Sequence, residues 1–369
     1  MYKSVETLLV EIPTIRPHKM AVATMQTQTL VLVKITAEDG LAGWGEATTI
    51  GGLGYGEESP ESVKANIETY FAPLLKSLKG LNVAQTMQAI KRNINGNRFA
   101  KCAVQTALLD IQAKRLGQPL SEVLGGRLRN SIPVLWVLAS GDTGKDIAEA
   151  QKMIAAQRHN IFKLKIGSRA VEADVEHVLA IKQALGKDIS IRVDVNRAWS
   201  ELEAVKGISL LQHGGVDLIE QPCAIDNIDA MERLTRKFDI AIMADESLMG
   251  PHSAYHLAKR NAASVFAVKV AQSGGLIEGC EVGKIAKLAG IDLYGGTMLE
   301  GPVGTIASAH AFSTFESLAY GTELFGPLLL TEEILKTPLQ YRNFELAVPQ
   351  QAGLGIELDE DKLDNLRRS

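Results

Sequence analysis

The segment Phe162-Lys-Leu-Lys-Ile-Gly167 is a short apolar strand that carries two lysines, and it is one of a series. Because successive side chains of a strand point to opposite faces, Lys163 and Lys165 share one face and the apolar side chains share the other. Similar apolar runs alternate with amphipathic helical patterns from about Ser131 onward. In order, the runs are SIPVLWVLA, FKLKIG, ISIRVDVN, DLIEQP, IAIMADES, VFAVKV, IDLYGGT and SLAYGTE. This rhythm predicts repeated βα units around a parallel sheet.

A polar residue stands near the carboxyl end of each strand from the second onward, and the spacing of these residues favours a barrel. Successive members are 24 to 29 residues apart, which fits one helix and two short loops. They are Lys165, Asp194, Glu220, Asp245, Lys269, Thr297 and Glu323. The pattern predicts an α/β fold with a closed (β/α) barrel, in which the chemistry lies at the carboxyl ends of the strands. An open doubly wound sheet is the competing fold, but no strand here leads into a G-x-G-x-x-G turn.

The first third of the chain has an α+β pattern instead. Thr29–Thr36 and Ala42–Ala47 are expected to form a hairpin. A glycine-rich loop follows at 48–56. Helical patterns then occupy Pro60–Leu78 and Phe99–Leu116.

The length of 369 residues suits two domains rather than one. We expect an α+β domain over 1–127 and the barrel over 128–340. A C-terminal segment over 341–369 is expected to pack back on the N-terminal domain. Hydrophobic residues make up 46% and charged residues 22% of the chain, which is typical of a soluble globular protein.

Charge and cysteine content exclude several classes of function. The net charge of -4, with no run of lysine and arginine, argues against a nucleic-acid partner. No apolar stretch approaches the roughly 18 residues needed to cross a bilayer, so we expect no membrane association. Cys102, Cys223 and Cys280 are odd in number and not in metal-binding spacing, so free buried thiols in a reducing cytoplasm are expected.

Three carboxylates stand at the ends of three consecutive strands, at Asp194, Glu220 and Asp245. Clustered carboxylates repel one another and raise one another's pKa unless a cation lies among them. Oxygen ligands alone suit Mg²⁺ or Mn²⁺ and disfavour zinc, which prefers histidine or cysteine. The alternative interpretation is a structural salt-bridge cluster at the barrel rim. Charges in register on five consecutive strands favour a functional site.

The two lysines of the first quoted strand indicate acid–base chemistry. A free lysine has a pKa near about 10.4, too high for a base at neutral pH. We expect the like charge of Lys163 and partial burial to lower the pKa of Lys165. Lys163 also supplies positive charge for an anionic substrate, and Lys269 would face the other side of that substrate. The remaining histidines are expected to be surface or core residues without ligand spacing: His159, His177, His213, His252, His256 and His310.

Taken together, these motifs resemble the enolase superfamily, in its muconate cycloisomerase subgroup, over essentially the whole chain. The residues that carry the resemblance are Lys163-Leu-Lys165, Asp194-Val-Asn196, Ile219-Glu-Gln-Pro222, Ala244-Asp-Glu-Ser247, Val268-Lys269, the linker Gly117-Gln-Pro-Leu to Leu124-Gly-Gly, and the loop Thr48 to Ser59. The resemblance implies a modified TIM (β/α)7β barrel. It also implies that the α+β domain is a capping domain completed by the C-terminal segment, with specificity loops near 18–25 and 48–56.

The resemblance also implies a set of residue roles. Asp194, Glu220 and Asp245 would be ligands of Mn²⁺ or Mg²⁺, and Lys165 the proton donor. Lys163, Lys269 and Glu323 would be further catalytic groups. Substrate-facing positions would be Ile50, Tyr55 and Phe325, of which Ile50 and Phe325 favour the non-chlorinated branch, and supports behind the ligands would be Asn196 and Glu246. His18 lies in a loop that resembles the second capping loop.

The activity implied is an isomerase that converts cis,cis-muconate, a small dicarboxylate from catechol breakdown, into muconolactone through an enolate. A cytoplasmic homo-oligomer, an octamer by analogy, is implied as well. Same-family alternatives are a chloromuconate cycloisomerase, a dipeptide epimerase and an o-succinylbenzoate synthase. A metal-free Schiff-base aldolase and a non-catalytic metabolite-binding barrel are alternatives from other classes.

Overall fold

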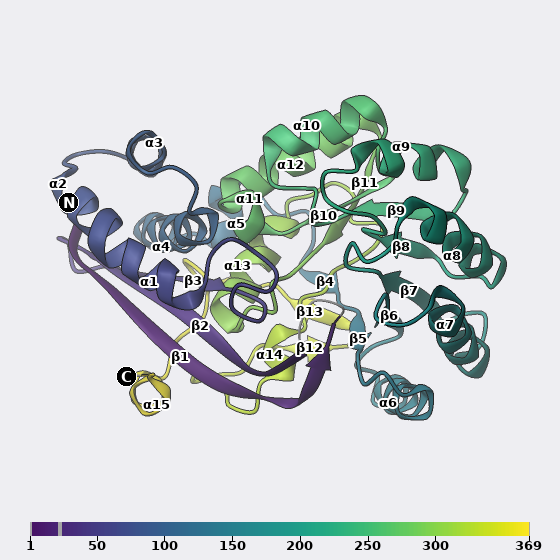
Figure 1. Ribbon diagram of the computed structural model, residues 1–369. Helices are drawn as coiled ribbons and strands as arrows, with labels where there is room; N and C mark the ends of the chain where they lie inside the picture. Colours follow the sequence, from purple (N-terminus) through teal and green to yellow (C-terminus); the bar gives the residue numbers. More distant parts are fainter. Residues whose placement is uncertain (1, 21–23, 369) are drawn as a thin grey trace.

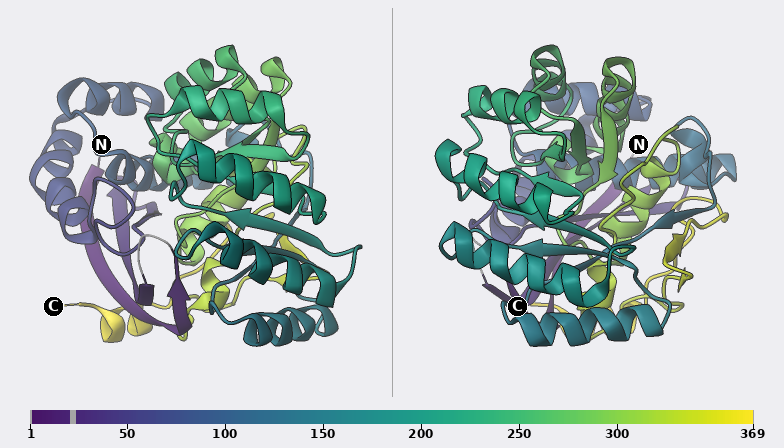
Figure 2. Two further views of the ribbon diagram at one scale, coloured as in Figure 1. Left: turned by 45° about the vertical axis from the view of Figure 1, so that its right-hand side comes forward. Right: turned by 90° about the vertical axis from the view of Figure 1, so that its right-hand side faces the viewer.

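The computed structural model describes residues 2–20 and 24–368 and shows two packed parts, an N-terminal cap and a barrel (Figure 1). Residues 21–23, which belong to the loop expected near 18–25, lie outside the described residues. Figure 2 shows the purple and blue cap on one side of the teal and green ring of barrel helices. No helix within the described ranges is long and apolar enough to cross a membrane.

The cap is an antiparallel sheet covered by helices. Its strands lie in the order β1 (Tyr2–Lys19), β2 (Thr24–Ala37) and β3 (Ala42–Thr48), so the expected hairpin is present as β2–β3. The helices are α1 (Pro60–Asn66), the π-helical turn η1 (Ile67–Phe71), α2 (Ala72–Ser77), α3 (Val83–Asn93), α4 (Arg98–Leu116) and α5 (Leu120–Val123). The strand β1 and the helix α3 were not expected from the sequence.

Two glycines in β3 let the sheet and α4 approach closely. A Cβ at Gly45 would lie 1.9 Å from the carbonyl oxygen of Ala103, and one at Gly43 would lie 2.1 Å from that of Ala107. Both distances are far shorter than any real contact, so only glycine allows this packing. The close approach fixes the end of β3, from which the loop expected at 48–56 departs toward the barrel.

Seven parallel strands form the barrel sheet in the order β11-β10-β9-β8-β7-β6-β5. They are β5 (Trp136–Leu138), β6 (Ile161–Lys165), β7 (Ser190–Asp194), β8 (Leu218–Glu220), β9 (Ala241–Ala244), β10 (Val265–Val268) and β11 (Asp292–Gly295). The helices between and after them are α6 (Thr143–Ala155), α7 (Val171–Leu185), α8 (Glu201–His213), α9 (Ile228–Lys237), α10 (Pro251–Arg260), α11 (Val270–Ser273), α12 (Leu276–Ala289), α13 (Pro302–Phe312) and α14 (Gly326–Leu329). The expected α/β barrel with alternating strands and helices is confirmed.

The ring closes at Thr322 rather than at a full eighth strand. Thr322 forms parallel bridges with Val134 on one side and Gly295 on the other. The run SLAYGTE was expected to be a strand, but Leu318 to Gly321 form a turn, in which the Gly321 amide donates to the Leu318 carbonyl and Gly321 adopts a φ of +62°. Pro133 opposite accepts from the Thr322 amide and has no amide of its own to donate, so the ladder stays short.

The first expected barrel strand, SIPVLWVLA, is split into two elements. Its second half is β5, whereas its first half is β4 (Ser131–Pro133), which pairs antiparallel with β13 (Glu345–Ala347). β13 also pairs with β12 (Tyr341–Arg342). The C-terminal segment then reaches the cap, since Leu354 donates to the Asp110 side chain of α4 and α15 (Glu360–Leu366) lies beside β1 in Figure 1. The domain boundaries themselves stay a prediction.

Candidate metal centre and active site

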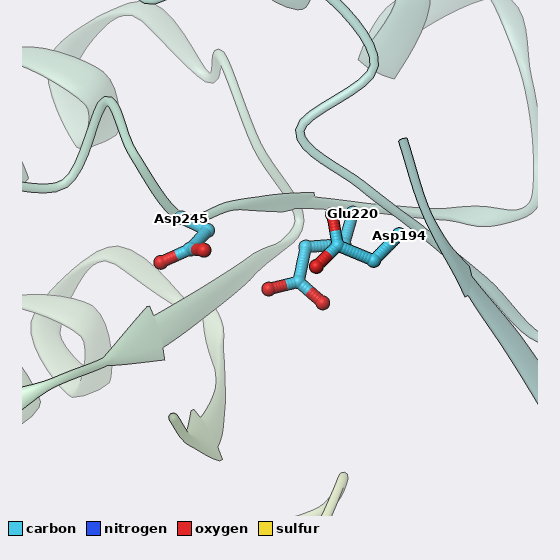
Figure 3. Close-up of side chains that lie close together, drawn as sticks. All are labelled: Asp194, Glu220 and Asp245. Carbon is cyan, nitrogen blue, oxygen red and sulfur yellow. The ribbon is translucent and has the colours of Figure 1, made fainter. Parts of the chain in front are cut away.

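Three buried carboxylates converge at the carboxyl ends of adjacent barrel strands (Figure 3). Asp194 ends β7, Glu220 ends β8 and Asp245 directly follows β9. The parallel register places Asp194 directly beside Glu220. One oxygen from each carboxylate lies within 4.8 Å of the others, and all three residues are at most 1% exposed. We refer to these residues as the acid trio.

The acid trio fits a divalent cation. Glu220 Oε1 and Asp245 Oδ1 are buried and have no hydrogen-bond partner among the described residues. An unpartnered buried carboxylate oxygen is unfavourable, and a cation bound among the three groups would remove that penalty. A donor set of oxygen atoms alone is the one that Mg²⁺ and Mn²⁺ prefer.

The pKa values of Glu220 and Asp194 are shifted in opposite directions. Burial, together with the charges of Asp194 and Asp245, raises the pKa of Glu220 well above its ordinary value. Burial alone would raise the pKa of Asp194 too, but the neighbouring Lys165 and Lys163 hold it below the usual range. Glu220 is therefore the carboxylate on which burial and repulsion act most, and a bound cation would relieve both.

The two lysines of β6 point into this charged cluster. Lys163 Nζ lies 2.7 Å from Glu220 Oε2 and 2.8 Å from Glu323 Oε1, and it stands 5.3 Å from the centre of the Tyr294 ring. Burial would lower the pKa of Lys163, but Glu220 and Glu323 raise it well above the ordinary value, so Lys163 is a fixed positive charge. Tyr294 in turn donates to Glu323.

Lys165 is the more accessible of the pair. Its side chain is 10% exposed, against 1% for that of Lys163, and its Nζ lies 2.5 Å from Asp194 Oδ2. It also lines the cavity described below. Lys165 thus combines contact with a trio residue and access to the space next to it, which are the two properties that a proton donor needs. Its proton-transfer role remains a prediction.

Lys269 follows β10 and reaches the acid trio from another strand. Its Nζ lies 2.7 Å from Asp245 Oδ2 and 2.6 Å from the hydroxyl of Tyr55. Tyr55 also donates to Asp245 Oδ2 at 2.6 Å. Tyr55 belongs to the glycine-rich loop of the cap, so this loop contacts a carboxylate of the acid trio directly.

Four neighbouring side chains support the acid trio. Asn196 and Glu246 were expected in this role, and Gln221 and Gln272 were not. Asn196 donates its backbone amide to Asp194 Oδ1 and its side-chain amide to Asp194 Oδ2 and Glu246 Oε1. Gln221 Oε1 accepts from the Asp245 amide, and Gln272 donates to the Asp245 carbonyl. Gln221 and Gln272 were not expected as supports, although Gln221 lies inside the motif Ile219-Glu-Gln-Pro222. Asn196 and Gln221 have φ values of 46° and 33°, rare for residues with a side chain and typical of functional sites.

A small cavity of about 10 Å³ lies between the cap and these barrel groups. Its lining comprises His18, Met20, Ile50 and Tyr55 from the cap and Lys163, Lys165, Asp194, Lys269, Thr297, Leu299 and Glu323 from the barrel. Ile50 and Tyr55 therefore lie where the sequence analysis placed them, beside the lysines. Phe325 is fully buried and packs 5.0 Å from the Trp136 ring and 6.5 Å from the His18 ring, and it is not among the lining residues. Its role as a substrate-facing residue stays a prediction.

His18 is an unusual member of this cavity. It is fully buried, yet neither ring nitrogen has a partner in the part of the chain that the structure describes. Burial lowers the pKa of His18 well below its ordinary value, and Lys165, Arg16 and Lys163 lower it further. The ring is therefore neutral and offers one N–H donor and one acceptor to whatever occupies the cavity.

A second cavity of about 220 Å³ adjoins the first and shares Met20 and Lys165 with it. Its ionisable lining residues are all cationic, namely Lys19, Lys165 and Arg169. Such a lining attracts anions. The larger hollow of about 740 Å³ formed by 337–357 contains none of the site residues.

Comparison with known proteins places this site in a family. Residues 4–125 match the model of the mandelate racemase / muconate lactonizing enzyme N-terminal domain, and residues 145–362 match that of the enolase C-terminal domain-like family. The chain belongs to the mandelate racemase / muconate lactonizing enzyme family. Members of this enolase-related family depend on a divalent metal ion, and the acid trio could bind one.

Individual members of the mandelate racemase / muconate lactonizing enzyme family match the chain from end to end. Muconate cycloisomerase 1 of Acinetobacter baylyi is 75% identical over 369 residues and covers 100% of both chains. The crystal structure of the muconate lactonizing enzyme of Pseudomonas fluorescens, complexed with muconolactone, superposes with a TM-score of 0.98 at 54% identity and covers 100% of this chain and 99% of that one. The chloromuconate cycloisomerase CbnB of Cupriavidus necator is 42% identical, with 100% and 99% of the two chains covered.

Proposed function

We propose that this chain is a muconate cycloisomerase, an isomerase that converts cis,cis-muconate into muconolactone in the breakdown of catechol. The observation that carries the proposal is the 75% identity, over the full length, to a muconate cycloisomerase. The chemistry of the site agrees with it, because a dianionic substrate needs positive charge, and Lys163 and Lys269 provide it beside the acid trio.

The chain's own residues account for the main steps of the reaction. One substrate carboxylate adds through oxygen to the conjugated double bond, and the displaced electron pair moves toward the other carboxylate. Lys163, held by Glu220 and Glu323, supplies positive charge where that negative charge grows. A divalent cation held by the acid trio would act as a Lewis acid toward the same carboxylate. Lys165 then donates a proton to the carbon next to that carboxylate, which completes the lactone. Lys165 afterwards recovers a proton from solvent.

The cap completes the site by shaping and closing it. Ile50 and Tyr55 come from the glycine-rich loop and His18 from the end of β1. Holding a flexible diacid in its cyclising conformation supplies much of the rate enhancement in an intramolecular addition. We propose that the neutral ring of His18 donates a hydrogen bond to the carboxylate that becomes the lactone oxygen, and that the glycine-rich loop excludes water.

Several finer features belong to the same proposal. The ion would be Mn²⁺ or Mg²⁺, because all three ligands are carboxylates. Plain muconate would be preferred to chlorinated muconate, since the chloromuconate enzymes are the more distant relatives, at 42% identity for CbnB. The enzyme would work as a homo-oligomer in the cytoplasm, as the resemblance to its family implies.

The direct test is a spectrophotometric assay of the loss of the muconate diene absorbance. Protein stripped with a chelator and dialysed is expected to be inactive, and added Mn²⁺ is expected to restore turnover. A matched Glu220→Gln variant is expected to stay inactive at every Mn²⁺ concentration, because one ligand carboxylate is lost. Full activity of the stripped protein would exclude the acid trio as the site. No muconate turnover, combined with deuterium uptake from heavy water into a dipeptide, would identify an epimerase instead.

A further inference from the structure

The helix α10 (Pro251–Arg260) carries two exposed histidines one turn apart. His252 and His256 lie four residues apart, and their rings stack edge to face with centroids 4.5 Å apart. Their Nε2 atoms are 3.3 Å apart. No ligand spacing was expected among the histidines from the sequence. His252 and His256 are nevertheless adjacent, because residues four apart on a helix are neighbours on its surface.

The backbone beneath this pair is firmly held. Ala254 and Leu257, on the opposite face of α10, are at most 2% exposed, and α10 packs on α12, as Figure 1 shows. Gly250, with a φ of +99°, and Pro251 set the start of the helix. The two imidazoles are therefore presented outward from a fixed frame, so a ligand does not have to order the helix in order to bind.

The distance between the two nitrogens fits two corners of a metal tetrahedron. Zinc–imidazole bonds are about 2.0–2.1 Å long, and the tetrahedral angle then places two ligand nitrogens about 3.3–3.4 Å apart. The observed 3.3 Å matches this separation with the side chains as they stand. Two histidines at this spacing on one helix face are also the arrangement that helical zinc sites use.

We propose that His252 and His256 form a surface site for a divalent transition-metal ion that favours imidazole, such as Zn²⁺ or Ni²⁺. Each neutral ring donates its Nε2 lone pair, and water fills the remaining positions. The site is independent of the proposed activity and of the acid trio. The two sites select different ions, because nitrogen ligands favour Zn²⁺ and Ni²⁺ whereas carboxylates accept Mg²⁺ and Mn²⁺.

The test uses the full-length protein without an affinity tag, saturated with Mn²⁺, and measures Zn²⁺ binding by equilibrium dialysis at neutral pH. The parent protein is expected to bind one more Zn²⁺ per chain than the double variant His252→Gln, His256→Gln. Each single variant is expected to weaken that binding by at least about tenfold, since one of two protein ligands is lost. His213→Gln, which removes another exposed histidine at the end of α8, is the matched control and is expected to bind Zn²⁺ as the parent does.

Two further readouts decide the matter. Untagged parent protein is expected to be retained on an immobilised Ni²⁺ column, and the double variant to elute earlier. Muconate turnover with Mn²⁺ is expected to be equal in all variants, because none of these histidines touches the acid trio. Equal Zn²⁺ stoichiometry and affinity in the parent and the double variant would overturn the proposal.

Discussion

The barrel side and the cap side of the candidate site are built from different kinds of residues. The barrel side carries lysines and carboxylates held in short ion pairs, such as Lys163 with Glu220 at 2.7 Å. The cap side contributes mostly uncharged groups, namely His18, Met20, Ile50 and Tyr55. The barrel groups project from hydrogen-bonded parallel strands, whereas the cap groups lie at and beyond the ends of β1 and β3.

This contrast suggests a division of labour. Charge transfer and proton transfer need groups fixed to a fraction of an ångström, and neighbouring strands of a barrel provide such a frame. Selection of the substrate and exclusion of water need a wall that can move, and loop segments provide it. If the division is correct, changes on the barrel side reduce the rate of the chemical step, and changes on the cap side mainly weaken substrate binding.

The largest effect is expected from Lys165→Ala on the barrel side. Removing the proton donor should lower kcat by about 10³-fold or more, in the range of general acid–base catalysis, with the fold and Mn²⁺ binding retained. Lys165→Arg keeps the charge beside Asp194 but not a transferable proton, so it should be equally inactive. Lys19→Ala, which removes a neighbouring cation of the cap, should stay within a few-fold of the parent. Diene loss under saturating substrate measures all three, and parent-like turnover of Lys165→Ala would remove that residue from the mechanism.

The next largest effect is a change in stability with pH, and it is expected at Glu46 of β3, where the cap contacts the barrel. Glu46 is buried and accepts from the amides of Gly301 and Gly304 at the start of α13. Burial raises the pKa of Glu46 to about 7. The folded protein therefore binds the proton of the Glu46 carboxyl more tightly than the unfolded chain does, because in the unfolded chain the pKa of this carboxyl is about 4.3. The contribution of protonated Glu46 to the free energy of unfolding is fully present below the unfolded-state pKa. It is lost as the pH rises through the folded-state pKa of about 7.

Glu46→Gln isolates this contribution. The parent's free energy of unfolding should fall relative to that of the variant by up to about 3 kcal/mol between pH 4.5 and pH 7.5. Urea unfolding at both pH values measures it. Glu57→Gln, which changes an exposed carboxylate of the same cap, serves as the control and should track the parent. A parent-to-variant difference that does not change with pH would mean that Glu46 is not the group that titrates.

The smallest of the three effects is expected from His18→Leu on the cap side. Loss of one hydrogen bond to a charged substrate group is worth about 2 kcal/mol, so kcat/KM should fall about 30-fold, mainly through KM. Stability without substrate should be unchanged or higher, because a buried ring with no partner among the described residues is removed. His18→Gln retains a donor and should recover part of the loss. A fall in kcat with no change in KM would show that His18 acts in the chemical step, as the barrel groups do, and would contradict the proposed division between cap and barrel.

Much of the site could be predicted from the sequence because strand geometry is local. Alternation in Phe162–Lys165 puts both lysines on one face, and the end positions of β7, β8 and β9 bring three acids to one rim. The hairpin β2–β3 followed from its turn and its apolar pattern in the same way. In each case, a periodicity of two residues along the strand contains the information.

Features that depend on partners distant in the chain were beyond such reasoning. The split between β4 and β5 depends on β13, more than two hundred residues later, which takes β4 into another sheet. The packing of Phe325 against the rings of Trp136 and His18 depends on how the cap docks on the barrel. Gln272 and Gln221 support Asp245 through contacts that no spacing along the chain announces.

By itself, the sequence determined the repeat of strands and helices, the face on which each charged side chain lies, and the family to which the chain belongs. These follow from local periodicity and from the identity of residues at strand ends. Only the tertiary structure decided which groups pair, which oxygens stay unpartnered, and how nearly the cap fills the space beside Lys165. Those properties depend on distances between segments far apart in the chain, and packing sets such distances only when the whole chain folds.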